Sequence, residues 1–219
     1  MGISESTIQP PSDLGDLLEL IGQVYDHRLK ECGPTAGGVF WKNQEGQALR
    51  YEILLQIIDG ADLGGGISIN DLGCGYGAFF EMLKDSPIMN TSKYFGYDIS
   101  LEMIDAARIR NHDTRAVFSH SPLATEIADY SFVSGTFNMF LGAKQNMWRD
   151  YVRSSIRLLW QNTKKGLAFN MLDAGSESRL LDLYYADLND MVDYAKTLTP
   201  NVEVVDDYPL DEWTILMRR

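Results

Sequence analysis

A glycine-rich loop between a predicted strand and a predicted helix constrains this chain more than any other feature. The apolar run at residues 67–72 predicts a buried strand, and residues 76–84 predict an amphipathic helix. Glycine lets backbone pass close to a ligand and adopt positive φ, and the following helix start offers free N–H groups and a positive dipole end. The order of strand, loop and helix therefore predicts ligand binding rather than a simple tight turn. The glycines of this loop are Gly73, Gly75 and Gly77.

An acidic residue, Asp98, ends the next predicted strand, at residues 93–99. A carboxylate at this place in an α/β sheet can accept hydrogen bonds from both hydroxyls of a ribose. Taken alone, Asp98 could equally serve the turn before the helix that is predicted to begin near Ser100. Because it follows the glycine loop by one helix and one strand, we interpret it as a ribose ligand.

Two cofactor classes fit a glycine loop with this acidic partner. The spacing of Gly73, Gly75 and Ala78 satisfies the dinucleotide fingerprint, so an NAD-dependent oxidoreductase is one alternative. However, Asp71 stands at the mouth of the loop, where a carboxylate repels a pyrophosphate and attracts an ammonium group. S-adenosylmethionine carries an amino group and a sulfonium and has no phosphate, so the charge pattern favours it. A non-enzymatic nucleoside-binding module is a third interpretation.

Short apolar runs alternate with amphipathic segments after residue 66, which predicts an α/β fold. We expect a Rossmann-like, doubly wound sheet of seven strands, mostly parallel. The last two strands are joined by too few residues for a parallel crossover, so the C-terminal strand should be antiparallel. Residues 1–66 are expected to form a helical cap and residues 67–219 one compact cofactor-binding domain. Strands are predicted at residues 67–72, 93–99, 115–119, 128–136, 165–172, 201–206 and 212–217, and helices near 12–25, 43–58, 76–84, 100–110, 146–160 and 177–198.

The stretch DLGCGYG followed by YDIS resembles motifs I and II of class I S-adenosylmethionine-dependent methyltransferases. Residues 67–219 are similar to that fold, including its final antiparallel strand. The resemblance implies that Gly73 and Gly75 let the backbone approach the methionyl moiety, with Cys74 contributing its backbone. It also implies that Asp71 faces the amino group of the cofactor, usually through water, and that Asp98 holds the ribose.

Further cofactor contacts follow from the same resemblance. Ile99 and Met103 would lie against the adenine ring, and Ser134, at the end of the fourth strand, would line the methionyl pocket beside Phe137. Some members use an arginine of a leading helix to pair with the cofactor's carboxylate, and Arg50 is the candidate here. The acidic residue that usually contacts the adenine edge is missing, and His120, Ser121 or a backbone group could supply the contact instead.

The implied reaction is an in-line displacement at a sulfonium carbon, in which the protein mainly aligns the acceptor and excludes water. No particular side chain is required by such a reaction, so we assign no catalytic base. Candidate bases lack a partner at a diagnostic spacing; they are His27, His120, Asp173, Tyr184, Tyr185 and Asp187.

Composition narrows the class of partner. Nineteen basic residues against 31 acidic ones give a net charge of −12, which disfavours a nucleic-acid substrate. Two cysteines and three scattered histidines show no metal-ligand spacing, so no metal is expected. No apolar run is long enough for a membrane span, and the first ten residues do not resemble a signal peptide, so we expect a cytoplasmic protein. The expected partner is a small-molecule methyl acceptor; its identity, the methylated atom and the oligomeric state stay open.

Overall fold

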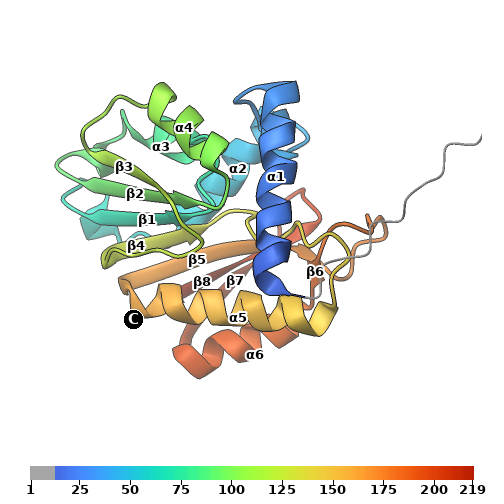
Figure 1. The fold of residues 1–219 in the computed structure, drawn as a ribbon. Coiled ribbons are helices and arrows are strands. Elements are labelled where there is room, and N and C mark those ends of the chain that lie inside the picture. Colours follow the sequence, from blue (N-terminus) through green and yellow to red (C-terminus); the bar gives the residue numbers. More distant parts are fainter. Residues whose placement is uncertain (1–12) are drawn as a thin grey trace, which may run out of the picture.

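A single twisted sheet organises the molecule (Figure 1). The computed structural model describes residues 13–219; Ser12 and the ten residues that argue against a signal peptide lie outside the described part. The strand order is β3-β2-β1-β4-β5-β8-β7, with β6 pairing only with β5. Every pairing is parallel except those of β8, which runs antiparallel to both β5 and β7. The strands are β1 (Ser68–Leu72), β2 (Lys93–Asp98), β3 (Ala116–His120), β4 (Ala128–Val133), β5 (Thr163–Asp173), β6 (Tyr185–Ala186), β7 (Asn201–Val205) and β8 (Glu212–Arg218).

This arrangement confirms the predicted α/β, Rossmann-like fold with an antiparallel C-terminal strand. Helices cover both faces of the sheet, each over its own buried apolar cluster. α2 (Gln44–Leu55), α3 (Ala78–Leu83) and α4 (Leu101–Arg110) lie on one face. α5 (Gln145–Gln161) and α6 (Leu188–Leu198) lie on the other. Among residues 13–219, no helix combines the length and the apolar character that crossing a membrane requires.

The first helix, α1 (Leu14–Cys32), stands across the edge of the sheet at which the parallel strands end (Figure 1). Asp13 caps it by accepting a hydrogen bond from the Gly15 amide at 2.7 Å. A second bond fastens it to the sheet region, because the Ser100 hydroxyl donates to the Asp26 carboxylate at 2.5 Å. Since Ser100 also caps α4, through the Met103 amide at 3.0 Å, α1 is held directly beside the turn that follows β2.

The prediction of one long helix at residues 177–198 is wrong for its first half. α6 begins only at Leu188, where Asp187 accepts a hydrogen bond from the Asp190 amide at 2.8 Å. The preceding segment instead contains the short strand β6, which pairs with the end of β5. Leu180 and Leu181, which completed the apparent apolar periodicity, are 65% and 92% exposed. Spacing alone could not distinguish two exposed leucines of a loop from the buried stripe of a helix.

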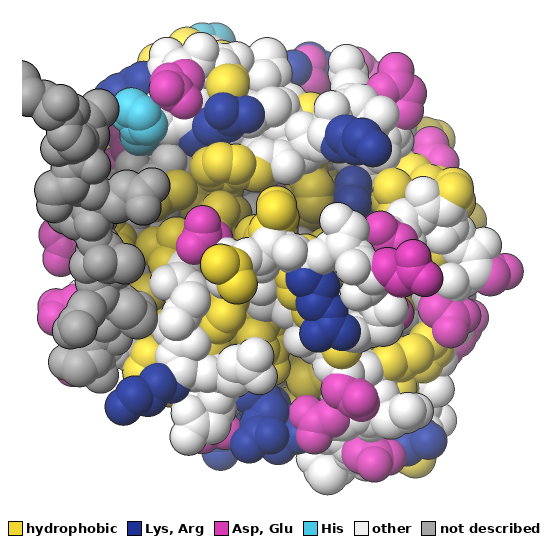
Figure 2. All heavy atoms as spheres, turned by 90° about the vertical axis from the view of Figure 1, so that its right-hand side faces the viewer, with side chains coloured by type: hydrophobic (Ala, Val, Ile, Leu, Met, Phe, Trp, Pro, Cys, Tyr) yellow, Lys and Arg dark blue, Asp and Glu magenta, His cyan; other side chains and the backbone are white. Residues whose placement is uncertain are grey.

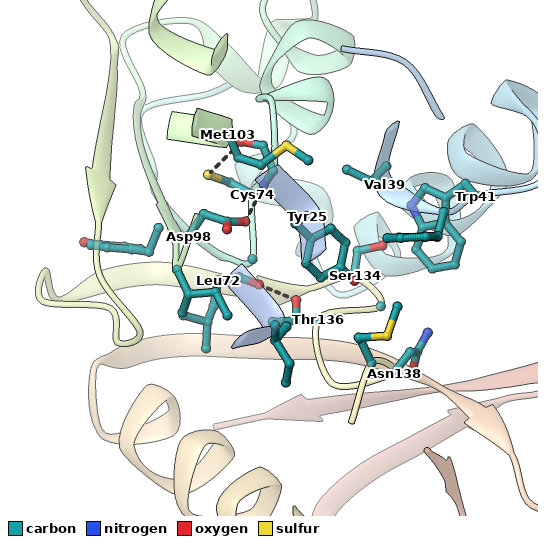
Figure 3. Close-up of a pocket in the computed structure, with 18 of the residues that line it drawn as sticks. Tyr25, Val39, Trp41, Leu72, Cys74, Asp98, Met103, Ser134, Thr136 and Asn138 are labelled. Atoms are coloured by element: carbon teal, nitrogen blue, oxygen red, sulfur yellow. Dashed lines mark hydrogen bonds between the residues drawn. The ribbon is translucent and has the colours of Figure 1, made fainter. Parts of the chain in front are cut away.

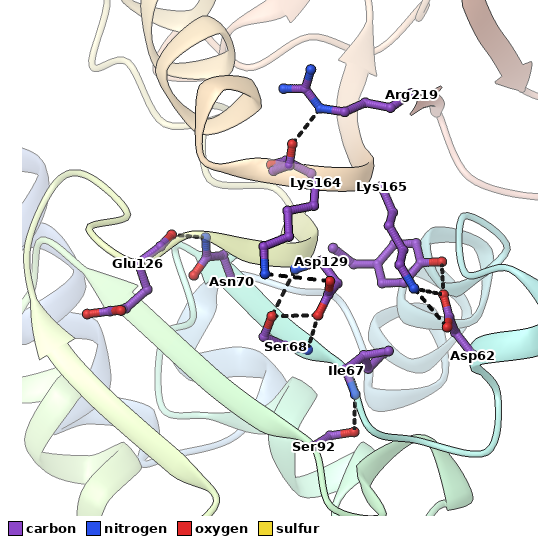
Figure 4. Close-up of polar contacts among 12 residues, drawn as sticks. Asp62, Ile67, Ser68, Asn70, Ser92, Glu126, Asp129, Lys164, Lys165 and Arg219 are labelled. Carbon is purple, nitrogen blue, oxygen red and sulfur yellow. Dashed lines mark hydrogen bonds and ion pairs between the residues drawn. The ribbon is translucent and has the colours of Figure 1, made fainter.

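The opposite edge of the sheet, at which the parallel strands begin, is closed by paired polar side chains (Figure 4). Asp129 accepts hydrogen bonds from the amide and the hydroxyl of Ser68, at 2.8 and 2.7 Å. Nearby, the Lys165 ammonium lies 2.7 Å from the Asp62 carboxylate. These contacts join β1, β4, β5 and the loop before β1.

Candidate active site

A cavity of about 270 Å³ opens at the carboxyl ends of the parallel strands. Figure 2 shows this face of the molecule, with hydrophobic side chains gathered in a hollow at its middle and charged side chains around the rim. The hollow lies where β1 and β4 are neighbours, which is the point at which the strand order reverses. In open α/β sheets this switch point is the usual place for a ligand.

The glycine loop forms one wall of the cavity, directly after β1. Gly73 and Gly75 have φ values of +80° and +52°, a region that side-chain-bearing residues rarely adopt. A Cβ at Gly73 would lie 2.1 Å from Oγ1 of Thr136, whose hydroxyl donates to the Leu72 carbonyl at 2.7 Å. At Gly75 a Cβ would lie 3.3 Å from Val39. The sequence therefore needs glycine here both for the turn and for the close approach of the β4 and N-terminal segments.

Asp98 lines the cavity beside this loop (Figure 3). Its two carboxylate oxygens accept hydrogen bonds from the Gly75 amide at 2.8 Å and the Ser100 amide at 2.9 Å. Burial raises the pKa of this carboxyl, and the amide donors oppose the rise. The side chain thus fixes the loop and the start of α4, and its remaining acceptor capacity faces the cavity.

A buried ion pair braces the far wall. The Arg50 guanidinium donates to Glu212 at 2.8 Å, and both side chains are at least nine-tenths buried. The guanidinium carbon of Arg50 lies 3.9 Å from the ring centroid of Trp41, which itself lines the cavity. The same carboxylate accepts from the Asn170 side-chain amide at 3.1 Å, and Asn170 accepts from the Gly135 amide at 2.7 Å. α2, β8, β5 and the loop after β4 are tied together in this way.

Comparison with known proteins shows the family. A family model described as a methyltransferase domain matches residues 69–166. A curated Mycobacterium tuberculosis protein named "Putative methyltransferase Rv1506c" is 36% identical over 169 residues, covering 75% of this chain and 99% of the relative. The chain belongs to the class I S-adenosylmethionine-dependent methyltransferases.

Solved structures of low identity share the fold of this methyltransferase. The 1,6-didemethyltoxoflavin-N1-methyltransferase of Burkholderia thailandensis superposes with a TM-score of 0.64 at 14% identity, covering 97% of this chain and 92% of that one. DhpI in complex with S-adenosylhomocysteine gives a TM-score of 0.65 at 13% identity, covering 94% and 98% of the two chains. The enzyme is a methyltransferase and its cofactor is S-adenosylmethionine, which sets aside the oxidoreductase and the non-enzymatic alternatives.

The structure brings most of the predicted cofactor residues of the methyltransferase to the cavity wall. Arg50, Gly73, Cys74, Gly75, Asp98, Ile99, Met103 and Ser134 all line it. Burial raises the pKa of the Cys74 thiol well above its usual value, so this side chain stays protonated at neutral pH. The glycine cradle and the unpaired, buried Ser134 hydroxyl oxygen fit a polar ligand such as the expected cofactor.

Asp71 is the exception, because the structure does not place it on the cavity wall. Strand alternation turns its side chain to the same face as Ile69, beneath α3, where the Tyr94 hydroxyl donates to its carboxylate. Burial raises the pKa of Asp71 to about 7, against the opposing effect of the Tyr94 hydrogen bond. An approach of this carboxylate to the cofactor's amino group through water, as the resemblance implies, stays a prediction, because Asp71 itself does not line the cavity. Alternation within residues 67–72 already carried this signal.

The two candidates for the adenine edge separate in the structure. Ser121 lines the cavity, and its amide donates to the Asp98 carbonyl at 2.9 Å. His120 is exposed and does not line the cavity; its Nε2 lies 2.9 Å from the Ile99 carbonyl oxygen.

None of the candidate bases lines the cavity. His27 lies on the outer face of α1, 3.3 Å from Glu31. Tyr184 is buried against Phe140, with ring centroids 5.8 Å apart. Phe137, the candidate for the methionyl pocket, is fully buried in the core instead. Within residues 13–219 there is also no group of three or more His, Cys, Asp or Glu side chains that could hold a metal ion.

Several cavity or bracing residues escaped prediction, and four of them carry the later argument. Tyr25, Trp41 and Asn138 line the cavity, and Glu212 holds Arg50. Trp41 and Asn138 come from segments without helical or strand periodicity, and Glu212 is 162 positions from its partner. The sequence offered no local signal for their meeting.

Proposed function

We propose that this methyltransferase transfers the methyl group of S-adenosylmethionine to a small organic acceptor that binds in the same cavity. The bound cofactor supplies a methyl group on a sulfonium sulfur, which is already an activated leaving group. The chain's own residues then have to align the acceptor and keep water out.

The observation that carries this proposal is the contrast between the two ends of one cavity. At the β2 and β3 end the lining includes Asp98, Ile99 and Ser121, a polar and apolar mixture suited to a nucleoside. At the β4 and β5 end the lining is mostly aromatic and apolar, with Trp41 and Leu172. Gly73, directly after the strand β1 that lies between these two ends, lines the cavity as well. One ligand at each end would bring the two reactants together.

We propose roles for the lining residues on this basis. Asp98 holds the ribose, and Gly73 and Gly75 leave room for the methionyl part of the cofactor. Arg50 contacts the cofactor's carboxylate through Nη2, because Nε donates to Glu212 and Nη1 donates to the Gly46 carbonyl at 3.0 Å.

The size of the cavity supports a small acceptor rather than a macromolecule. About 270 Å³ lies just below the range of roughly 300–1,000 Å³ that small-molecule sites occupy. α1 and the 3₁₀ helix Ala36–Val39 contribute Tyr25 and Val39 to the wall, so the N-terminal segment covers the strand ends. The Burkholderia thailandensis methyltransferase named above was solved with bound 1,6-didemethyltoxoflavin, also a small molecule.

Two tyrosines of the wall act as hydrogen-bond donors rather than as bases. Burial, and secondarily the charge of Asp98, raises the pKa of Tyr25. Burial also raises the pKa of Tyr151. Both hydroxyls are therefore protonated at neutral pH and can orient an acceptor.

Calorimetric titration with S-adenosylhomocysteine tests the cofactor half of the proposal. The wild-type chain should bind it, and Asp98→Ala and Gly73→Val should each weaken binding by about 100-fold, since charge-assisted bonds or the backbone cradle are lost. Asp129→Asn, at the opposite edge of the sheet, is the matched control and should leave the affinity unchanged. Unchanged affinity in both cavity variants would overturn the assignment of this cavity to the cofactor.

Transfer itself is measured with methyl-labelled S-adenosylmethionine and a fractionated pool of small metabolites. Label should appear in a low-molecular-weight product with wild type and not with Asp98→Ala. Label found only in added protein or RNA would contradict the small-acceptor proposal.

A further inference from the structure

Asn138 carries a side-chain amide that the fold buries without using. The residue lies just after β4, is 7% exposed, and lines the cavity. Its Oδ1 is buried with no hydrogen-bond partner among the described residues. The backbone of Asn138, in contrast, is held at both polar groups: its N–H donates to the Gly135 carbonyl at 3.2 Å, and its carbonyl accepts from the Tyr184 backbone N–H at 2.7 Å. A buried amide without a partner is costly, so a rigidly held one facing a cavity points to a ligand.

Trp41 lies beside this amide. Gly135 has a φ of +66°, and a Cβ there would lie 2.3 Å from the Trp41 ring and 3.4 Å from Nδ2 of Asn138. The absence of a side chain at Gly135 therefore lets the ring and the amide approach the same piece of backbone. In Figure 3 Asn138 lies at the lower side of the cavity, with Ser134 and Trp41 above it.

The surroundings of the amide hold their shape before any ligand arrives. The Gly135 amide is held by Asn170, which is held by Glu212, and Glu212 pairs with the Arg50 guanidinium that covers Trp41. A preformed wall lowers the ordering cost of binding. It also places the ring and the amide in a fixed relation, which is the condition for selecting a ligand by shape.

The wall beside Asn138 is mostly apolar. Met139 and Leu183 line the cavity there, Arg50 is compensated by Glu212 at 2.8 Å, and Lys42 is the other cationic side chain of the lining. A side-chain amide offers one acceptor and two donors in one plane. A ligand with an N–H group next to a carbonyl is complementary to it. The ligand N–H donates to the amide oxygen, and the ligand carbonyl accepts from the amide NH₂.

We propose that Asn138 anchors the methyl acceptor, and that this acceptor is an uncharged planar molecule with an N–H beside a C=O, a lactam or cyclic imide, lying against Trp41. The inference rests on the proposed function, since it describes the acceptor half of the same cavity. It adds a substrate class and a specificity-determining residue.

The probes are quinolin-2-one, a planar lactam, and coumarin, which has the same outline with a ring oxygen in place of the N–H. Each is titrated by calorimetry into the full chain saturated with S-adenosylhomocysteine. Wild type should bind quinolin-2-one roughly tenfold or more tightly than coumarin, because coumarin leaves the Asn138 oxygen unpaired. Equal binding of the two, or no binding of quinolin-2-one up to its solubility, would overturn the proposal.

Variants locate the preference. Asn138→Leu keeps the volume and removes both polar atoms, so the preference for the lactam should fall to about twofold or less. Asn138→Asp keeps the acceptor oxygen but replaces the donor NH₂ with a second acceptor oxygen, which repels the lactam carbonyl, so the lactam should lose affinity there too. Asn111→Ala is the matched control, since Asn111 is also buried with an unpaired Oδ1 but does not line the cavity, and it should keep the wild-type preference.

The outcome separates this inference from the proposed function. If S-adenosylhomocysteine binds all variants equally and the lactam preference survives Asn138→Leu, the inference fails while the cofactor assignment stands. If S-adenosylhomocysteine does not bind the wild-type chain, the proposed function fails first. Should Asn138→Leu not fold, as judged by its thermal transition, the comparison rests on Asn138→Asp.

Discussion

The two edges of the sheet differ in what their polar side chains contact. At the edge where the parallel strands begin, Asp129 accepts two bonds from Ser68 and Asp62 pairs with Lys165, so the polar groups satisfy one another (Figure 4). At the edge where they end, Ser134 and Asn138 have buried oxygens with no protein partner. Both edges are built from the same strands, so the strands themselves do not explain the difference.

We interpret the difference as a division of roles: the paired polar groups at the first edge stabilise the fold, and the unpaired ones at the second edge are available to a ligand. Paired polar groups contribute modestly to folding, whereas an unpaired buried group costs free energy until something binds it. Arg50 also belongs to the second edge: its Nε and Nη1 are paired with Glu212 and the Gly46 carbonyl, which brace the wall, and Nη2 is left for a ligand. Removing a paired polar group at the first edge should therefore lower the free energy of unfolding, and removing an unpaired one at the second edge should raise it. Breaking the Arg50–Glu212 pair should have the largest effect.

The largest effect is expected from Glu212→Ala. Arg50 would stay buried without its counter-charge, which costs about 3–5 kcal/mol of the free energy of unfolding. The double variant Arg50→Met, Glu212→Leu should recover most of that loss, since no buried charge remains. Urea denaturation of wild type, the single variant and the double variant measures this. A loss below about 1 kcal/mol in the single variant would show that the Arg50–Glu212 pair does not support the cavity wall.

The second effect concerns the pH dependence of stability. The pKa of Asp71 is about 7 in the folded chain, above the ordinary value of an unfolded aspartate. Between these values the folded state holds a proton that the unfolded state has lost, so stability falls as pH rises. Between pH 5 and pH 7 the wild type should lose about 2 kcal/mol of its free energy of unfolding through this group, and Asp71→Asn should not show that loss.

Urea unfolding at several pH values measures this loss for Asp71→Asn and wild type. Asp129→Asn is a suitable control, since the pKa of Asp129 is lowered, not raised. Parallel stability curves for wild type and Asp71→Asn would contradict the prediction.

A smaller loss is expected at the amino edge. Asp129→Ala leaves the Ser68 amide and hydroxyl without their acceptor and should cost about 1–2 kcal/mol of the free energy of unfolding. The affinity for S-adenosylhomocysteine should not change, because the cavity lies at the other ends of the strands. A weakened affinity at unchanged fold would show that the two edges are coupled.

The smallest effect has the opposite sign. Asn138→Leu replaces an unpaired buried amide with an apolar group of similar volume and should raise the free energy of unfolding by up to about 1 kcal/mol. Thermal and urea unfolding without ligand measure it. A loss of more than about 1 kcal/mol would mean that Asn138 already serves the fold, and the contrast between the edges would then be weaker.

Local patterns predicted the parts of the site that lie within one strand, turn and helix. The glycine loop and Asp98 end adjacent strands, and adjacent parallel strands end side by side, so their meeting at one edge follows from chain order. The burial of Asp71 under α3 was also predictable, because the side chain alternates in the strand with Ile69. The start of α6 was missed because two exposed leucines imitated a helical stripe.

The sequence by itself determined the α/β fold, the antiparallel last strand and the cofactor loop, since each depends on periodicity, loop length or glycine at neighbouring positions. Only the tertiary structure decided that Glu212 meets Arg50 across 162 positions and that Trp41 and Asn138 meet at Gly135. Such contacts depend on how helices and loops pack around the sheet, and no local spacing encodes them. The part of the cavity proposed for the cofactor could therefore be predicted from the sequence, and the part proposed for the acceptor could not.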